Sequence, residues 1–288
     1  MKGKGFTLIE MLVSIVIFVI VMLGVYTFFD QGLWFYQAAE KRANIQDMGR
    51  IAIEQMERDF RMIGSGVPYG GQITAGTSVW TPFLFQANTS DIGFRGDMDA
   101  RNSMLRTSAS ANPVSVHDAD RLCSRDGASL PIAIVIADER RRWQPVNCTA
   151  YNGAADTITI SATVACTASE CEATTPEHVW YRLDGDADGD GICDATTVTD
   201  YPFCTLERAE QFGNTPITTP TVGYEEVATN IVNLQFEYFE LDGSASASNV
   251  VAQRIRITMV VRDKSSTRPG QFQDFNLGTE VVLRDQRY

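Results

Sequence analysis

The N-terminal segment most constrains the fold, because a long apolar run there contains a single acid. The run extends from Phe6 to Phe29, covers 24 residues and includes Glu10. As a helix it would be about 36 Å long, enough to cross a hydrocarbon core of about 30 Å with some tilt. An acid inside such a core costs about 2.5–3.5 kcal/mol on insertion scales, so Glu10 is predicted to be functional.

The order of basic and apolar residues predicts how this segment is inserted. A secretory signal has an apolar part of roughly 7–15 residues, which a small-residue cleavage site follows. Here the apolar part is longer and the one cleavage-like residue, Gly5, precedes it. Processing would therefore leave the span on the mature chain. Lys2 and Lys4 predict that residues 1–5 are a cytoplasmic leader and that the chain after the span is exported.

The residues from Gly5 to Glu10 read Gly-Phe-Thr-Leu-Ile-Glu and resemble the processing motif of type IV pilins and of type II secretion pseudopilins. The resemblance implies that prepilin peptidase cuts between Gly5 and Phe6 and that the new amine of Phe6 is methylated. It also implies that Glu10 meets the amine of a neighbouring subunit in a filament. Such a pair offsets the desolvation of both charges. The alternative is an unpaired acid near the membrane interface.

The helix is predicted to continue beyond the membrane to Ile63. No proline interrupts it after Asp30, and apolar residues recur at steps of three or four. This stripe consists of Ile45, Met48, Ala52, Met56, Phe60 and Ile63. The segment from Gly64 to Pro68 then ends the helix. Residues 6–29 are thus predicted to be transmembrane and residues 30–63 amphipathic, packed on a globular head. The predicted helix fits two interpretations equally well: a membrane anchor with a stalk, or the core helix of a filament.

Residues 64–288 are predicted to form an exported, β-rich head. The fold class is therefore α+β, with a long N-terminal helix packed on that head as in the pilin fold. Short stretches rich in β-branched and aromatic residues are separated by turn formers. These predicted strands are Ile132–Ala137, Thr157–Ala162, Val179–Leu183, Leu234–Leu241, Arg254–Val261 and Glu280–Arg284. A flexible turn separates the fourth from the fifth, which predicts a hairpin. Gly64–Ser129 has too few apolar runs for an assignment.

The six cysteines all lie in the part predicted to be exported, and an even number in an oxidising compartment predicts three disulfides. Proximity in the sequence favours the pairs Cys123–Cys148, Cys166–Cys171 and Cys193–Cys204. The alternatives are free thiols or a metal site. A zinc site would use closely spaced cysteine pairs, and only the second pair is spaced in that way.

An acidic loop is the second motif of the chain. Its acids are Asp184, Asp186, Asp188, Asp190 and Asp194. The first three occupy offsets one, three and five and Gly189 occupies offset six, as in the first half of an EF-hand calcium loop. Asp190 would offer its backbone carbonyl. Ala195 replaces the usual final glutamate, so Asp194 would complete the shell. The loop resembles those of thrombospondin type 3 repeats. It predicts a structural Ca²⁺, with a solvated acidic turn as the alternative.

Charge and missing motifs argue against several classes of function. The formal net charge of −12 argues against nucleic-acid binding, which needs a basic surface. The basic cluster at residues 139–142 is interpreted as a solvated loop face. The two histidines, His117 and His178, belong to no metalloprotease motif, and neither a nucleophile elbow nor a phosphate-binding loop occurs. His117 is interpreted as a surface residue, and the chain is predicted not to be an enzyme.

Two segments indicate a subgroup of the family. Residues 52–64 resemble the helix end of PilW-type minor pilins and of the related J-type pseudopilins, although Met62 and Ile63 replace the usual alanine. The last predicted strand fits as well, although it ends in Asp285 rather than the usual asparagine. The resemblance implies a minor pilin that starts or caps a type IV pilus with other minor pilins, first in the inner membrane and then at the cell surface. A J-type pseudopilin and a calcium-dependent adhesin at a pilus tip remain open alternatives.

Overall fold

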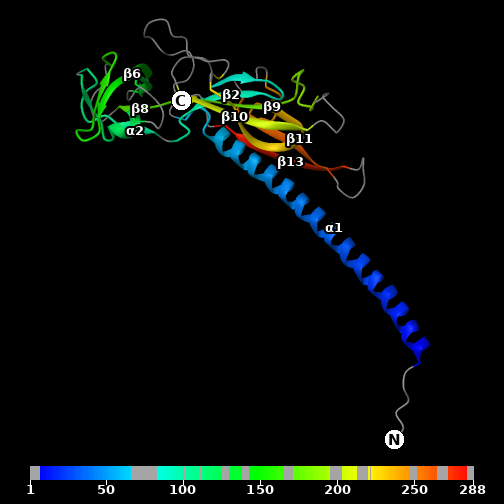
Figure 1. Ribbon diagram of the computed structural model, residues 1–288. Coiled ribbons are helices and arrows are strands. Elements are labelled where there is room, and N and C mark those ends of the chain that lie inside the picture. The colour runs from blue at the N-terminus through cyan, green and yellow to red at the C-terminus, as the bar shows by residue number, and fades with distance from the viewer. Residues whose placement is uncertain are drawn as a thin grey trace.

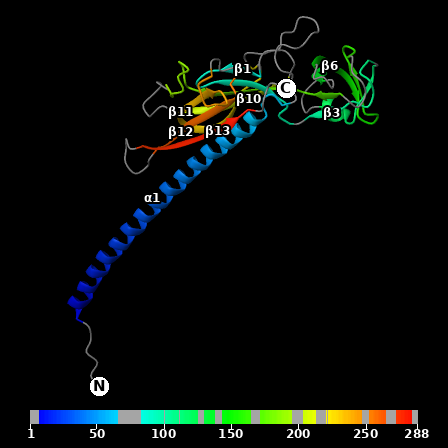
Figure 2. The same ribbon diagram turned by 180° about the vertical axis from the view of Figure 1, so that it is seen from behind.

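A long helix carries a β-rich head at its C-terminal end (Figures 1 and 2), so the predicted α+β class is confirmed. The computed structural model describes residues 7–65, 83–99, 101–110, 112–124, 130–137, 143–164, 171–194, 203–212, 220, 222–246, 252–264 and 272–283. The elements are α1 (Leu8–Arg61), β1 (Leu84–Ala87), β2 (Ile92–Gly96), β3 (Asn102–Met104), β4 (Val114–Ser115), α2 (Ala119–Cys123), β5 (Ile132–Ala137), β6 (Trp143–Asn152), β7 (Thr157–Ile160), β8 (Glu172–Thr174), β9 (Glu177–Asp184), β10 (Cys204–Phe212), β11 (Glu225–Phe239), β12 (Arg254–Lys264) and β13 (Phe272–Val282).

Local sequence determines both ends of α1. At its start the Thr7 hydroxyl accepts a hydrogen bond from the Glu10 amide at 3.3 Å, and the Glu10 carboxylate accepts one from the Thr7 amide at 3.1 Å. This capping box satisfies amides that no helical carbonyl can reach. At the other end Gly64 adopts φ +75°, a conformation that favours glycine. The helix ends at Arg61 rather than at the predicted Ile63, because the last amides bond to carbonyls three residues back instead of four.

Two antiparallel sheets make up the described part of the head. The first, which we call the helix-bearing sheet, has the strand order β1-β2-β9-β10-β11-β12-β13, and the second has the order β3-β8-β5-β6-β7-β4. The second sheet and α2 are formed by the chain between β2 and β9, which are neighbours in the first sheet. We call residues 102–174 the inserted lobe. It lies beyond the C-terminal end of α1 in both views (Figures 1 and 2).

The predicted hairpin is confirmed as β11 and β12. Leu234 lies opposite Met259 and Phe236 opposite Ile257, and these four side chains are at most 3% exposed. The other predicted strands correspond to β5, β7, β9 and β13, with β9 and β13 longer than expected. The unassigned stretch 64–129 contains β1 to β4, which are only two to five residues long and so offer little periodicity to detect.

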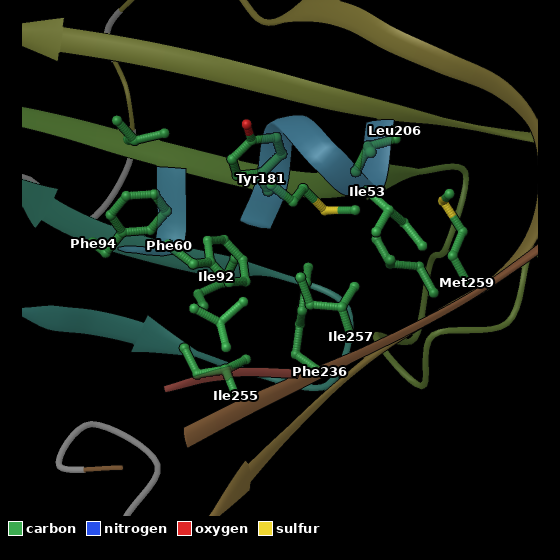
Figure 3. Close-up of a cluster of buried hydrophobic side chains, with 14 of the residues drawn as sticks. Ile53, Phe60, Ile92, Phe94, Tyr181, Leu206, Phe236, Ile255, Ile257 and Met259 are labelled. Carbon is green, nitrogen blue, oxygen red and sulfur yellow. The ribbon is translucent and has the colours of Figure 1, made fainter. Parts of the chain in front are cut away.

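The second half of α1 packs its apolar face on the helix-bearing sheet (Figure 3). The apolar side chains that the helix contributes to this core, each at most 7% exposed, are Ala52, Ile53, Met56 and Phe60, and Ile63 follows in the next turn. The ring of Phe60 lies between those of Phe94 and Phe236, at centroid separations of 5.4 and 5.8 Å. The predicted stripe is therefore confirmed from Ala52 to Ile63, whereas Met48 is 38% exposed.

A buried ion pair also joins the helix to the sheet. Asp59 lies on the buried face of α1 and is 5% exposed. Its Oδ2 accepts hydrogen bonds from the Tyr181 hydroxyl at 2.7 Å and from Arg208 Nε at 2.9 Å. Arg208 also pairs with Glu210 at 2.7 Å. Burial, together with the charge of Asp59, raises the pKa of Tyr181 well above its usual value. The sequence pattern does not mark Asp59, because its partners lie on distant strands.

Asp59→Ala is expected to destabilise the head by about 3 kcal/mol, because Arg208 and the Tyr181 hydroxyl would stay buried with one partner fewer. The measurement is denaturant-induced unfolding of the full chain in detergent. Arg50→Ala is the matched control, since Arg50 is an exposed residue of the same helix. Its removal should change the free energy of unfolding by less than about 0.5 kcal/mol. Equal stability of the two variants would contradict the role of Asp59.

Candidate functional site: an assembly helix and an acidic loop

The first half of α1 is an apolar surface that the described head leaves uncovered. Every residue from Leu8 to Gln37 is exposed. Among the described residues, α1 is the one helix that is long and apolar enough to cross a membrane by length and composition. Gly5 and Phe6, the predicted cleavage residues, lie outside the described residues. Their roles therefore rest on the sequence.

Glu10 lies in the first turn of α1, where its carboxylate has partners within the chain. Oε2 accepts hydrogen bonds from the amide and from the hydroxyl of Thr7, both at 3.1 Å. A negative charge at this position also interacts favourably with the positive end of the helix dipole. The predicted filament partner is an amine created at Phe6 of another subunit, so the pairing of Glu10 in a filament stays a prediction.

The acidic loop follows β9, and its central acids converge. Asp186, Asp188 and Asp190 each place a carboxylate oxygen within 4.8 Å of the others. The two carboxylate oxygens of Asp186 also accept hydrogen bonds from the backbone amides of Gly189 and Gly191, each at 2.9 Å. These bonds wind the loop tightly, and the three carboxylates come to lie side by side at the surface.

The two outer acids of the predicted ligand set do not join this group. Asp184 lies at the end of β9, 3.8 Å from Arg182. Asp194 turns back into the loop, where its Oδ2 accepts a hydrogen bond from the backbone amide of Ala187 at 3.2 Å. Three of the five predicted ligands are therefore brought together, and Asp184 and Asp194 lie outside this group.

The C-terminal end of the loop is fixed to the helix-bearing sheet. The disulfide Cys193–Cys204 ties it to β10, and the Cys193 amide donates to the Val232 carbonyl at 3.1 Å. Gly191 has φ +88°, and a Cβ there would lie 2.4 Å from the Leu234 carbonyl oxygen. Only glycine fits at this position. The loop thus holds its acids in a defined arrangement.

Two of the three cysteine pairs favoured by sequence proximity are disulfides, Cys123–Cys148 and Cys193–Cys204. The first joins the end of α2 to β6 and closes the inserted lobe around its own core. Cys171 is also disulfide-bonded, and its predicted pairing with Cys166 lies outside the described residues. Bonded sulfurs at the described positions leave no thiolate for zinc and fit an oxidising compartment.

A second group of acids lies where the inserted lobe joins the helix-bearing sheet. Asp97, Asp99 and Glu177 have carboxylate oxygens within 4.8 Å of one another. The Glu177 carboxylate accepts a hydrogen bond from the backbone amide of Met98 at 2.7 Å. The backbone amide of Arg101 donates a hydrogen bond to Asp97 at 2.8 Å. The Arg101 side chain forms an ion pair with Asp99 at 2.5 Å. Protein donors bind all three acids, and these contacts join the inserted lobe to the helix-bearing sheet. Burial raises the pKa of Asp97 to about 6.

Asp91 is a further acid near the loop that the sequence did not indicate. It precedes β2 and approaches the loop because β2 and β9 are neighbours. Burial, and then the charge of Asp186, raises the pKa of Asp91. No local motif links two segments so far apart in the sequence, so this proximity follows only from the strand order.

Residues 1–26 match the family model described as the prokaryotic N-terminal methylation motif. The match covers the leader, the predicted cleavage residues Gly5 and Phe6, Glu10, and the first part of the exposed helix. Comparisons with curated proteins and with solved structures found no match. The motif supports a type IV pilin-like or pseudopilin-like protein that prepilin peptidase processes. The uncovered apolar helix is consistent with membrane anchoring.

The two histidines lie in different environments. His117 is exposed, in agreement with its interpretation as a surface residue. His178 is 0% exposed, with its ring 5.5 Å from that of Phe85 and 5.8 Å from that of Trp180, and neither of its nitrogens forms a hydrogen bond. Burial, and then the charge of Arg95, lowers the pKa of His178 to about 3. His178 is therefore a neutral core residue.

This burial of His178 is expected to make the head sensitive to acid. The unfolded chain protonates the histidine below its ordinary pKa of 6.5, whereas the folded chain resists protonation down to about pH 3. Stability is therefore lost as the pH falls between these values. Phenylalanine does not take up a proton, so the variant His178→Phe should not lose stability in this way. The free energy of unfolding of the variant, relative to the parent, should rise by up to about 1.4 kcal/mol for each pH unit below 6.5.

The measurement is denaturant unfolding of the variant and the parent side by side between about pH 4 and pH 7. The comparison cancels the contribution of Asp97, which has the opposite sign. Its pKa is raised from 3.8 to about 6, so it stabilises the folded chain as the pH falls through that range. Parallel curves for the two proteins would refute the contribution of His178.

Proposed function

We propose that this chain is a minor type IV pilin of the PilW type, which helps to start or cap a pilus near its tip. One observation carries the proposal. The methylation motif at residues 1–26 leads into a helix that is uncovered in its first half and packed into a large head in its second half. Such a helix offers a membrane anchor and, later, an apolar surface for the helices of other pilins.

In this proposal prepilin peptidase cuts after Gly5 and the new amine of Phe6 is methylated. Lys2 and Lys4 keep the leader in the cytoplasm, the span lies in the inner membrane, and the head is in the periplasm. The disulfides of the head support its export. Glu10 would then pair with the amine of a neighbouring pilin, because each charge offsets the desolvation of the other. Assembly moves the head into a pilus at the cell surface.

The inserted lobe supports a position near the tip. It lies at the end of the molecule that is farthest from the span (Figure 1). Bulk at the outer end suits a subunit that begins a filament, since no earlier subunit has to occupy that space. A J-type pseudopilin would share the same helix and leader, and would differ in the machine that it joins.

Gly5→Ala should block removal of the leader, because the resemblance places the cut directly after this residue. Mass analysis of the N-terminal peptide, from protein made in its native cells, should find methylated Phe6 in the parent. The variant should still begin at Met1 or Lys2. A normally shortened variant, or a parent that keeps residues 1–5, would rule out the assigned cleavage.

Glu10→Ala is the companion variant in this experiment and separates assembly from processing. It should be cut and methylated normally, yet be strongly reduced in sheared surface pili relative to the membrane fraction. Normal incorporation would remove the role assigned to Glu10 while leaving the cleavage assignment intact. Loss of enzyme secretion with normal piliation, in cells that lack the protein, would favour the pseudopilin alternative.

We further propose that the acidic loop binds a structural Ca²⁺ through Asp186, Asp188 and Asp190. Three observations support this: the 4.8 Å convergence of the carboxylates, the positive φ of +77° at Gly189, and the disulfide that fixes the loop. Hard carboxylate oxygens in a flexible shell suit Ca²⁺. The ion would also offset repulsion among the acids. Asp194 would have to leave its amide partner to join the shell.

Ca²⁺ is expected to raise the Tm of the full chain in detergent, and a chelator to lower it. An ion that binds only the folded loop stabilises it by about 2.7 kcal/mol at roughly a hundredfold excess over Kd. Asp188→Asn combined with Asp190→Asn should abolish the shift, whereas Asp47→Asn, which alters an exposed acid on α1, should keep it. An unchanged Tm in the parent would count against the site. Chelator-sensitive binding to cells or glycans would favour the adhesin alternative.

A further inference from the structure

An exposed aromatic band follows the apolar span on α1. It consists of Leu33, Trp34, Phe35 and Tyr36, which are between 52% and 70% exposed. Four consecutive helical residues point to all sides of the helix, so no single face of the head is able to cover them. The described head indeed leaves the whole band open. An apolar surface of this kind marks a site that something else covers.

The positions of two acids define where the hydrocarbon core lies on α1. Between Glu10 and Asp30 there are 19 residues without a charge. They correspond to about 28 Å of helix, close to the thickness of a hydrocarbon core of about 30 Å. The core therefore fits between the two acids, with one at each boundary. Glu10 then lies at the cytoplasmic boundary and not deep in the lipid.

The aromatic band falls in the next layer of the bilayer. Leu33 and Trp34 lie about 4–6 Å beyond Asp30 along the helix, and Phe35 and Tyr36 lie about 7–9 Å beyond it. The interfacial layer on each side of the core is about 5–7 Å deep, so the first two residues fall within it and the last two lie at its outer edge. The amphipathic rings of tryptophan and tyrosine favour that layer, and the band contains one of each. Length and chemistry therefore agree on the same placement.

The head begins directly beyond the band. Ala38 is the first buried residue of α1, at 7% exposure. Arg42 Nε then pairs with Asp263 at 3.2 Å. Asp263 lies near the end of β12, whose partner β13 runs beside α1 (Figures 1 and 2). The ends of β12 and β13 near Arg42 are thus the part of the described head that is closest to the span.

We propose that Leu33–Tyr36 form a lipid-binding band that occupies the phospholipid headgroup layer on the side of the head. The band sets the depth of α1 in the membrane before the chain enters a filament. It holds the ends of β12 and β13 next to the membrane surface. The partner is phospholipid rather than another pilin, because the band is continuous with the span and its position matches the headgroup layer. This inference rests on membrane insertion, which the proposed function shares, and not on filament assembly.

The depth of Trp34 can be measured by fluorescence quenching with the full-length precursor in phospholipid vesicles. The lipids carry bromine either near the glycerol backbone or near the end of the acyl chain. Trp34→Phe, which keeps three of the 4 tryptophans, supplies the background to subtract. Trp34 should be quenched several-fold more by the shallow bromines. The matched control adds Ile20→Trp to Trp34→Phe. Deep bromines should quench that tryptophan more, because Ile20 lies midway between the two acids.

Each other result would overturn the inference. Equal quenching of Trp34 by both lipids, or stronger quenching by the deep bromines, would place the band in hydrocarbon. An unquenched Trp34 beside a responsive control would place the band in water while leaving the span intact. If the tryptophan introduced at position 20 is not quenched either, the helix does not span the bilayer. In that case the membrane anchoring of the proposed function fails as well.

Discussion

The interface between the second half of α1 and the helix-bearing sheet holds the rest of the structure together. Apolar side chains pack around Phe60, and Asp59 adds a polar contact between the helix and the sheet. The approach is close: a Cβ at Gly49 would lie 2.5 Å from Leu277. Folded cores are densely packed, so this contact holds the helix and the sheet in one arrangement.

Features with strong local periodicity could be predicted from the sequence. The long helix, its buried stripe and the hairpin of β11 and β12 each repeat a pattern over several turns or pleats. Strand β10 was missed because charged residues interrupt its alternation. Those charges have partners only in the folded chain: Glu207 binds Arg182 at 2.8 Å, and Arg208 binds Asp59. The insertion of residues 102–174 was also missed, since the pairing of β2 with β9 leaves no local trace.

The candidate sites show the same limit. Spacing alone identified the acids of the loop, but it did not show that Asp184 and Asp194 bind other groups. Glu10 was identified as an anomaly in an apolar run, yet its interaction with Thr7 depends on where the helix begins. In the proposed membrane placement, Glu10 and Asp30 are two charges that bracket a segment of bilayer thickness.

The position of the inserted lobe has a consequence for how such a protein changes over evolutionary time. The chain leaves the helix-bearing sheet after Gly96 and returns at Glu177, and these two residues are direct partners across β2 and β9. A short turn would join the two strands if the lobe were absent. The lobe therefore enters and leaves the sheet at a single pair of residues, and Val135 of β5 is its contribution to the core beneath the helix. An insertion at one such crossing point can change in length and sequence at a different rate from the helix and the sheet that carry it.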